Sequence, residues 1–134
     1  MTIHGSCLCG AVRYEINGLL ADACSCHCSK CRKAHGAAFS TYASLNPDEF
    51  RWTAGENTVG VYESSRSAGR CFCRRCGSTM GWIEAGTVSW VTLGTVDGDP
   101  GVRPQAQIFV GSKAPWHDIC DKVPQFRAWA PAKK

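Results

Sequence analysis

The eight residues from Cys24 to Cys31 hold four of the chain's ten cysteines. Alternate residues of an extended chain face the same side, so Cys24, Cys26 and Cys28 can present their sulfur atoms together. Cys31 follows Cys28 at a C-x-x-C spacing, and a turn would bring its thiolate back toward the others. Converging thiolates suit zinc, which binds sulfur at ~2.3 Å in a tetrahedral arrangement. We therefore predict a metal site here in preference to disulfides or inert thiols.

A second set of cysteines lies in two separate turns, each followed by glycine: Cys7-Leu8-Cys9-Gly10 and Cys73-Arg74-Arg75-Cys76-Gly77. Each turn directs two thiolates to one point, and Gly10 permits the tight backbone path beside a metal ion. Together these four cysteines make a closed zinc site, which is structural because no coordination position stays open. Zinc binding at such sites is worth ~10–16 kcal/mol in apparent terms and is coupled to folding. We expect this site to tie the N-terminus to the middle of the chain.

The cysteines Cys26, Cys28 and Cys31 are predicted to hold a second zinc ion. Three protein ligands leave one position for water or substrate, which is typical of a catalytic zinc. The sequence leaves open whether Cys24 or Cys71 supplies a fourth sulfur and closes the site. The simpler interpretation of Cys71 is a thiol buried in the core.

Composition and charge narrow the class of protein. The chain has 134 residues, a hydrophobic content of 44% and a net charge of +4, and we expect a single globular domain over residues 1–134. The basic residues are scattered, whereas a nucleic-acid-binding surface calls for a denser patch. The sequence has neither a signal peptide nor an apolar run long enough to span a membrane, so we expect a cytoplasmic protein. In a reducing cytoplasm, clustered cysteines indicate metal or redox chemistry.

Short alternating segments are predicted to position the cysteines. We expect strands over residues 11–16, 21–28, 39–45, 50–53, 58–64, 78–84, 87–93 and 107–110, and one helical turn over 29–35 ending near Gly36. The acidic residue Asp97 is expected to form a turn. Residues 112–126 are expected to lie on the domain, anchored by Trp116 and Phe126. Many short strands with glycine-rich turns favour an all-β sandwich or open barrel.

Two histidines lie beside the second group of cysteines. His27 stands between two ligands, and on a strand it faces away from their sulfur atoms, so we expect a structural role. His35 lies one turn beyond Cys31, where it could carry protons.

The motifs resemble those of the glutathione-dependent formaldehyde-activating enzyme family, which shares its domain with centromere protein V. The resemblance covers about residues 5–126, and its motifs are residues 5–12, 26–33, 72–77 and 108–116. It implies a β-tent fold of small antiparallel sheets organised around cysteine knuckles, with two zinc ions per chain. Cys7, Cys9, Cys73 and Cys76 would hold the structural ion, and Cys26, Cys28 and Cys31 the catalytic one. The chain departs from the family in being shorter and in carrying the additional Cys24.

The resemblance implies a zinc-dependent carbon–sulfur lyase, or thiol–aldehyde adduct synthase, similar to S-(hydroxymethyl)glutathione synthase. An open zinc site would lower the pKa of a substrate thiol, and the thiolate would add to an aldehyde carbonyl. The substrates would be a small thiol such as glutathione and a small aldehyde, with Arg32 and Lys33 pairing with the carboxylates of glutathione. The alternative is a non-catalytic zinc module for a protein or nucleic acid partner, which a closed second site and a broad basic face would favour.

Overall fold

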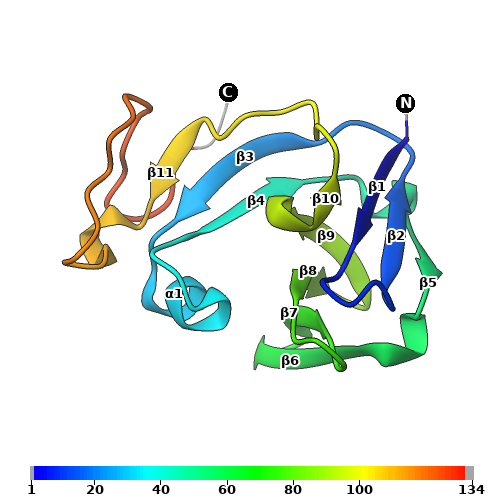
Figure 1. Ribbon diagram of the computed structural model, residues 1–134. Helices are drawn as coiled ribbons and strands as arrows, with labels where there is room; N and C mark the ends of the chain where they lie inside the picture. Colours follow the sequence, from blue (N-terminus) through cyan, green and yellow to red (C-terminus); the bar gives the residue numbers. More distant parts are fainter. Residues whose placement is uncertain (1, 132–134) are drawn as a thin grey trace.

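The computed structural model describes residues 2–131 and is mainly β, as predicted (Figure 1). Its strands are β1 (Ile3–Ser6), β2 (Arg13–Ile16), β3 (Ala21–Cys26), β4 (Ser40–Ser44), β5 (Phe50–Ala54), β6 (Val59–Ser65), β7 (Ala68–Cys73), β8 (Thr79–Glu84), β9 (Thr87–Thr92), β10 (Val96–Asp97) and β11 (Ala106–Ile108). Its helical segments are α1 (Ser29–His35) and the 3-10 turns η1 (Pro47–Glu49), η2 (Glu56–Thr58), η3 (Leu93–Thr95) and η4 (Val110–Ser112).

The strands form two sheets. One has four strands in the order β10-β1-β2-β5, and the other has seven in the order β11-β3-β4-β9-β8-β7-β6. All neighbouring strands are antiparallel except β11, which pairs with β3 in parallel. In Figure 1 the long sheet runs from β3 and β4 down to β6 at the base of the view, while β1, β2 and β5 stand at the right. The helix α1 follows the end of β3.

The two sheets share one hydrophobic core. The four-stranded sheet contributes Ile3, Tyr14 and Ile16, and the seven-stranded sheet contributes residues such as Met80 and Val91. This packing agrees with the predicted sandwich-like arrangement, in which two sheets bury their facing sides against each other. A smaller cluster of buried residues forms where β3, β4 and β11 meet: Cys26, Cys31, Tyr42, Ala106 and Ile108. Two cysteines of the second group, Cys26 and Cys31, therefore belong to this smaller cluster, and Cys28 packs against it.

The predicted strands are confirmed with boundaries shifted by a few residues, and the helix at residues 29–35 is confirmed with Gly36 as its C-cap. Three strands were not predicted: β1, β7 and β10. The sequence of β1, Ile-His-Gly-Ser, carries no apolar alternation beyond Ile3, so its strand conformation comes from pairing with β2 and β10. Tertiary pairing overrides local preference in such short segments.

Two expectations about single residues are wrong. Trp116 is 70% exposed and does not anchor the C-terminal segment, whereas Phe126 packs against the smaller core cluster. The C-terminal segment is instead attached by backbone hydrogen bonds, with Gln107 N–H donating to Pro124 and Phe126 N–H donating to Gln107. Asp97 is not a turn residue but lies in β10, where its carboxylate accepts hydrogen bonds from Ser6 Oγ at 3.1 and 2.9 Å.

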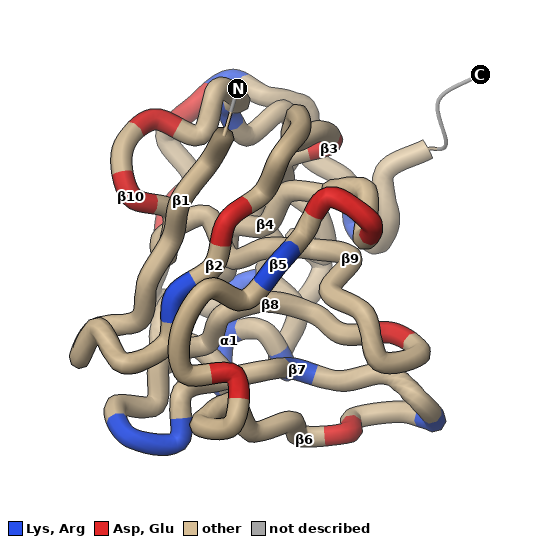
Figure 2. Tube along the Cα trace, turned by 90° about the vertical axis from the view of Figure 1, so that its right-hand side faces the viewer, with Lys and Arg blue, Asp and Glu red and all other residues tan. Residues whose placement is uncertain are grey.

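The surface carries basic and acidic residues interspersed along the chain rather than gathered by sign (Figure 2). No helix within residues 2–131 has both the length and the apolar character needed to cross a membrane.

Candidate metal centres

The sulfur atoms of Cys7, Cys9, Cys73 and Cys76 converge and lie within 4.8 Å of one another. Cys7 Sγ and Cys9 Sγ are 3.6 Å apart, and Cys9 Sγ and Cys73 Sγ are 3.8 Å apart. Four thiolates at ~2.3 Å from a zinc ion at the centre of a tetrahedron would be separated by about 3.8 Å. A disulfide, by contrast, requires a sulfur–sulfur distance of about 2 Å. The four residues therefore fit a tetrahedral metal ion of the size of zinc.

Two similar turns deliver these thiolates. Gly10 N–H donates to the carbonyl oxygen of Cys7 at 3.1 Å, and Gly77 N–H donates to that of Cys73 at 2.8 Å. Both glycines have positive φ, +80° and +82°, which other L-residues rarely adopt. This conformation explains why each cysteine pair is followed by glycine.

Backbone N–H groups point at the sulfur atoms of this four-cysteine cluster. Val12 N–H donates to Cys7 Sγ at 3.3 Å, and Arg75 N–H donates to Cys73 Sγ at 3.4 Å. The pKa of Cys76 is lowered to about 5, first by a hydrogen bond from the Ser78 side chain. Such donors stabilise thiolates, which are the form that binds a metal ion.

The four-cysteine cluster links the two sheets. Cys7 and Cys9 lie in the connection between β1 and β2 of the four-stranded sheet, and Cys73 and Cys76 lie at the turn between β7 and β8 of the seven-stranded sheet. Cys7 and Cys73 are buried, and Cys9 is exposed. A metal ion held here would cross-link both halves of the core.

The second cluster is local. Cys26 ends β3, Cys28 caps the N-terminus of α1, and Cys31 lies in the first turn of that helix. Cys31 N–H donates to Cys28 Sγ at 3.3 Å, which is the side-chain capping bond of the helix. The three sulfur atoms lie within 4.8 Å of one another, so this three-cysteine cluster can also hold a metal ion.

Within residues 2–131, the three-cysteine cluster has no fourth Cys, His, Asp or Glu ligand. Cys71, one open candidate, is fully buried in the main core, and burial raises its pKa to about 12. Cys24, the other candidate, also lies outside the cluster, and its pKa is raised to about 11, first by burial and then by the charge of Cys31. A tetrahedral metal ion held by these three sulfur atoms would therefore keep one coordination position that none of residues 2–131 fills.

Polar side chains from three elements surround the three-cysteine cluster. Arg70 of β7 donates from Nη2 to Cys31 Sγ at 3.5 Å. Tyr42 of β4 and His35 of α1 share a hydrogen bond of 2.8 Å between the phenolic oxygen and Nε2. The buried hydroxyl of Ser40 in β4 also interacts with the cluster, through a hydrogen bond that favours the ionised form of Cys31.

The hydrogen bonds around Cys31 favour its ionised form, whereas the bond between Cys26 and Cys31 raises the pKa of Cys26. The pKa of Cys31 is lowered to about 4, first by the hydrogen bond from Cys26, against the opposite effect of burial, and then by Ser40, Cys28 and Arg70. Burial raises the pKa of Tyr42 to about 12, so this hydroxyl keeps its proton at neutral pH. The cluster therefore combines a stable thiolate with a nearby neutral hydroxyl donor.

The interpretation of His27 as a structural residue agrees with its contacts. Its side chain is fully buried, and Nε2 donates to Gln107 Oε1 at 2.6 Å. Gln107 Nε2 in turn donates to Asp121 Oδ2 at 2.9 Å. His27 N–H also donates to the carbonyl oxygen of Ile108. These bonds fix the backbone between Cys26 and Cys28 against β11 and the C-terminal segment.

Arg70 and Tyr42 are neighbours of the second cluster that the sequence does not predict. Both lie in strands far from Cys26–Cys31 in the sequence, and no motif marks them. The sequence offered only a weak indication of the role of Arg70. It is a charged residue in a strand whose alternate residues Gly69, Cys71 and Cys73 are buried. The predicted basic residues Arg32 and Lys33 lie on α1, half-buried and exposed respectively.

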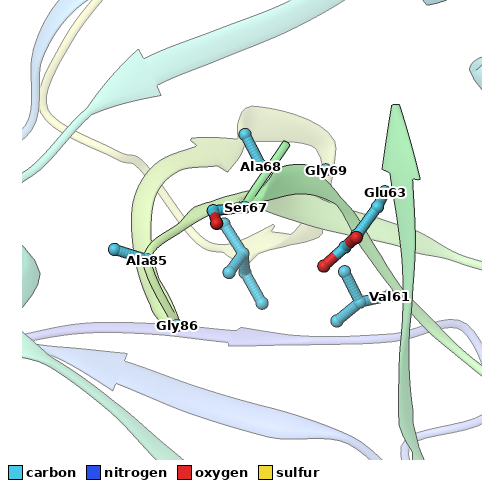
Figure 3. A pocket seen from close by; sticks show the side chains of 8 residues that line it. Val61, Glu63, Ser67, Ala68, Gly69, Ala85 and Gly86 are labelled. Carbon is cyan, nitrogen blue, oxygen red and sulfur yellow. The ribbon is translucent and has the colours of Figure 1, made fainter. Parts of the chain in front are cut away.

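A hollow of about 410 Å³ lies elsewhere, at the far ends of β6, β7 and β8 (Figure 3). It is lined by Val61, Glu63, Ser67, Ala68, Gly69, Ile83, Ala85 and Gly86. None of these residues belongs to either cysteine cluster, and a single carboxylate among mostly small residues offers no metal site. The side chains that could hold a metal ion therefore lie in the cysteine clusters and not in this hollow.

Comparison with known proteins gives a consistent result. The family model described as "Glutathione-dependent formaldehyde-activating enzyme" matches residues 2–112. A Schizosaccharomyces pombe protein named as an uncharacterized lyase is 26% identical over 125 residues, which is 92% of this chain and 89% of the relative. A Phaeosphaeria nodorum protein named for glutathione-dependent formaldehyde activation is 34% identical over 75 residues, 56% of this chain and 40% of the relative. The match thus spans less than half the length of that fungal relative.

Among solved structures, a crystal structure of a Rhodobacter sphaeroides protein, determined as a structural genomics target, is similar with a TM-score of 0.55. The sequence identity is 30%, over 91% of this chain and 98% of the other. The arrangement of strands is therefore shared with a protein of nearly the same extent.

Proposed function

The chain belongs to the glutathione-dependent formaldehyde-activating enzyme family, and on that premise we propose that it is a zinc-dependent carbon–sulfur lyase or thiol–aldehyde adduct synthase. The observation that carries the proposal is the three-cysteine cluster, which offers three sulfur ligands and no fourth. The four-cysteine cluster, which offers a complete set of four sulfur ligands, supplies the contrast between a structural and an open centre. We propose one domain over residues 1–134 acting in the reducing cytoplasm, where its ten free cysteines stay available.

In the proposal, Cys7, Cys9, Cys73 and Cys76 hold a structural zinc ion, and Cys26, Cys28 and Cys31 hold a catalytic one. When bound at the open centre, zinc would supply a ligation site for a substrate thiol and favour its ionisation. Arg32 and Lys33, in the last turn of α1, would pair with the carboxylates of glutathione.

The residues around the open centre suit the proton transfers of the reaction. When a thiol adds to formaldehyde, a carbon–sulfur bond forms, the thiol loses its proton, and the aldehyde oxygen gains one. Tyr42 and His35 share a hydrogen bond beside the cluster. Because Tyr42 stays protonated at neutral pH, we assign it as the donor to the aldehyde oxygen. Burial lowers the pKa of His35, so its neutral imidazole would take a proton from solvent and pass it to Tyr42, replacing the proton that the thiol released. The reverse reaction follows the same groups backward.

Protein purified without chelator is expected to contain two zinc ions per chain. The expectation rests on the division of seven cysteines into a group of four and a group of three. Elemental analysis of folded protein measures the stoichiometry and the identity of the metal. One ion or none in a folded sample would contradict it.

Glutathione is expected to bind the zinc-loaded protein with release of a proton, because a thiol must ionise to ligate a metal ion. Calorimetry in two buffers of different ionisation enthalpy would report the proton. Cys28→Ser should weaken binding, and Arg32→Ala should weaken it by an amount that decreases with added salt. Absence of binding by glutathione and other small thiols would exclude the enzyme interpretation in favour of the non-catalytic module.

The non-catalytic alternative calls for a closed second site and a broad basic face. The three-cysteine cluster and the interspersed charges in Figure 2 favour the enzyme instead. Names of relatives support a lyase as the general class, while the substrates named by the longer fungal proteins remain part of the proposal.

A further inference from the structure

We propose that Arg70 makes the three-cysteine centre selective for anionic thiolate ligands over neutral ones. The inference rests on the proposed function, and it names a residue that decides which ligand enters the fourth position. Arg70 lies outside the cysteine motifs and comes from β7, whereas the three ligands come from the β3–α1 segment.

The position of Arg70 is fixed from two sides. Its Nη2 donates to Cys31 Sγ at 3.5 Å. Its guanidinium lies over the Trp82 ring, 5.5 Å from the ring centroid, a cation–π contact across the β7–β8 pair. Arginine is planar and permanently charged, so this contact holds a positive charge beside the cluster at every physiological pH.

The charge balance of the centre explains why that cation matters. Three thiolates around a divalent ion carry a net charge of −1, and a fourth thiolate would raise the negative charge to −2. A neutral ligand such as imidazole leaves the charge unchanged. A cation in hydrogen-bond contact with one sulfur therefore lowers the cost of adding a thiolate and has little effect on a neutral donor. Among residues 2–131, Arg70 is the cationic side chain that donates a hydrogen bond to a sulfur atom of this cluster.

Arg70 also has a donor to spare. Its Nε is buried and has no hydrogen-bond partner among the described residues. A buried donor without a partner is costly, and an anionic ligand entering beside Cys31 would satisfy it. The selectivity for an anionic ligand thus rests on the positive charge of Arg70 and on its unpaired Nε donor.

The test compares two small probes on zinc-loaded protein by calorimetry. The first is 2-mercaptoethanol, which carries no charge except on its ionised sulfur, and the second is imidazole, a neutral ligand. Arg70→Gln removes the charge, Arg70→Lys keeps it, and Arg66→Gln removes the same charge from the exposed turn of the same β6–β7 hairpin.

We expect Arg70→Gln to weaken 2-mercaptoethanol binding by about tenfold, with imidazole binding and zinc content unchanged. Arg70→Lys should restore most of the affinity, and Arg66→Gln should match the wild type.

The outcomes separate this inference from the proposed function. If the wild type binds 2-mercaptoethanol and Arg70→Gln binds it equally well, Arg70 does not select the ligand, although the enzyme proposal stands. If Arg70→Gln loses zinc from the second centre, or loses both probes alike, the residue is structural and the inference is wrong. If the fully loaded wild type binds no thiol, the proposed function fails, and the inference fails with it.

Discussion

Cys76→Ser is expected to unfold the domain or to lower its melting temperature by tens of degrees, while Cys28→Ser is expected to leave it folded. Cys76 belongs to the four-cysteine cluster, which connects the four-stranded and seven-stranded sheets. Cys28 belongs to the cluster confined to the end of β3 and the first turn of α1. The first variant breaks a link between distant segments, and the second breaks a link within one loop.

The magnitude follows from the coupling of zinc binding to folding. Apparent binding free energies of ~10–16 kcal/mol at structural zinc sites compare with a net stability of ~5–15 kcal/mol for a typical domain. A variant that loses most of the zinc-binding free energy therefore loses more than the net stability of a typical domain, and we expect it to unfold. At the three-cysteine cluster, the segment is held independently by the β3–β4 and β3–β11 pairs and by the hydrogen bonds of His27.

Far-UV circular dichroism, thermal melting and zinc analysis on both variants measure the difference. Cys120→Ser is the matched control, because Cys120 is exposed and belongs to neither cluster. It should melt like the wild type. Equal destabilisation by Cys76→Ser and Cys28→Ser would mean that the second centre is structural too.

The cysteine clusters could be predicted from the sequence because ligand spacing is a local property. A C-x-C-G or C-x-x-C-G turn directs its thiolates wherever it occurs, so the grouping of Cys7 and Cys9 with Cys73 and Cys76 needed no knowledge of the sheets. The positive φ of Gly10 and of Gly77 accounts for the recurring glycine.

The surroundings of the second centre could not be predicted in the same way. Arg70 and Tyr42 reach it because β4, β9, β8 and β7 lie in that order in one sheet, and no local pattern specifies this order. Arg32 and Lys33 were selected because they follow Cys31 in the sequence, whereas the cation in contact with Cys31 Sγ comes from another strand. The expectation that Trp116 anchors the C-terminal segment rested on its apolar character. Apolar character alone does not establish burial, and Trp116 is exposed.

The strand β1 could not be predicted because its conformation depends on packing against a neighbouring strand. Its glycine weakens any local preference for a strand, yet Gly5 faces Tyr14 directly across the β1–β2 pair. The Tyr14 ring lies over Gly5, so a methyl group added there would meet Tyr14 Cζ at 2.0 Å. An aromatic ring covering a cross-strand glycine compensates for the missing side chain. The glycine is therefore part of the packing of the core.

Gly5→Ala is accordingly expected to destabilise the domain by about 3 kcal/mol, at the upper end of the usual cost of overpacking. The Tyr14 ring cannot move aside easily, because it is 1% exposed and stacks on Phe50 with ring centroids 5.2 Å apart. Its hydroxyl is also held by a 2.8 Å hydrogen bond with Thr95 Oγ1.

Thermal melting of zinc-loaded Gly5→Ala measures the effect, and for a domain of this size we expect the melting temperature to fall by roughly 10 °C. Gly94→Ala is the control, because an added methyl group there meets no atom within 4 Å, and its φ lies outside the positive range that disfavours alanine. Its melting temperature should match that of the wild type. If Gly5→Ala melted like Gly94→Ala, Tyr14 would have room to shift. The packing around Tyr14 in the core would then be looser than its contacts with Phe50 and Thr95 indicate.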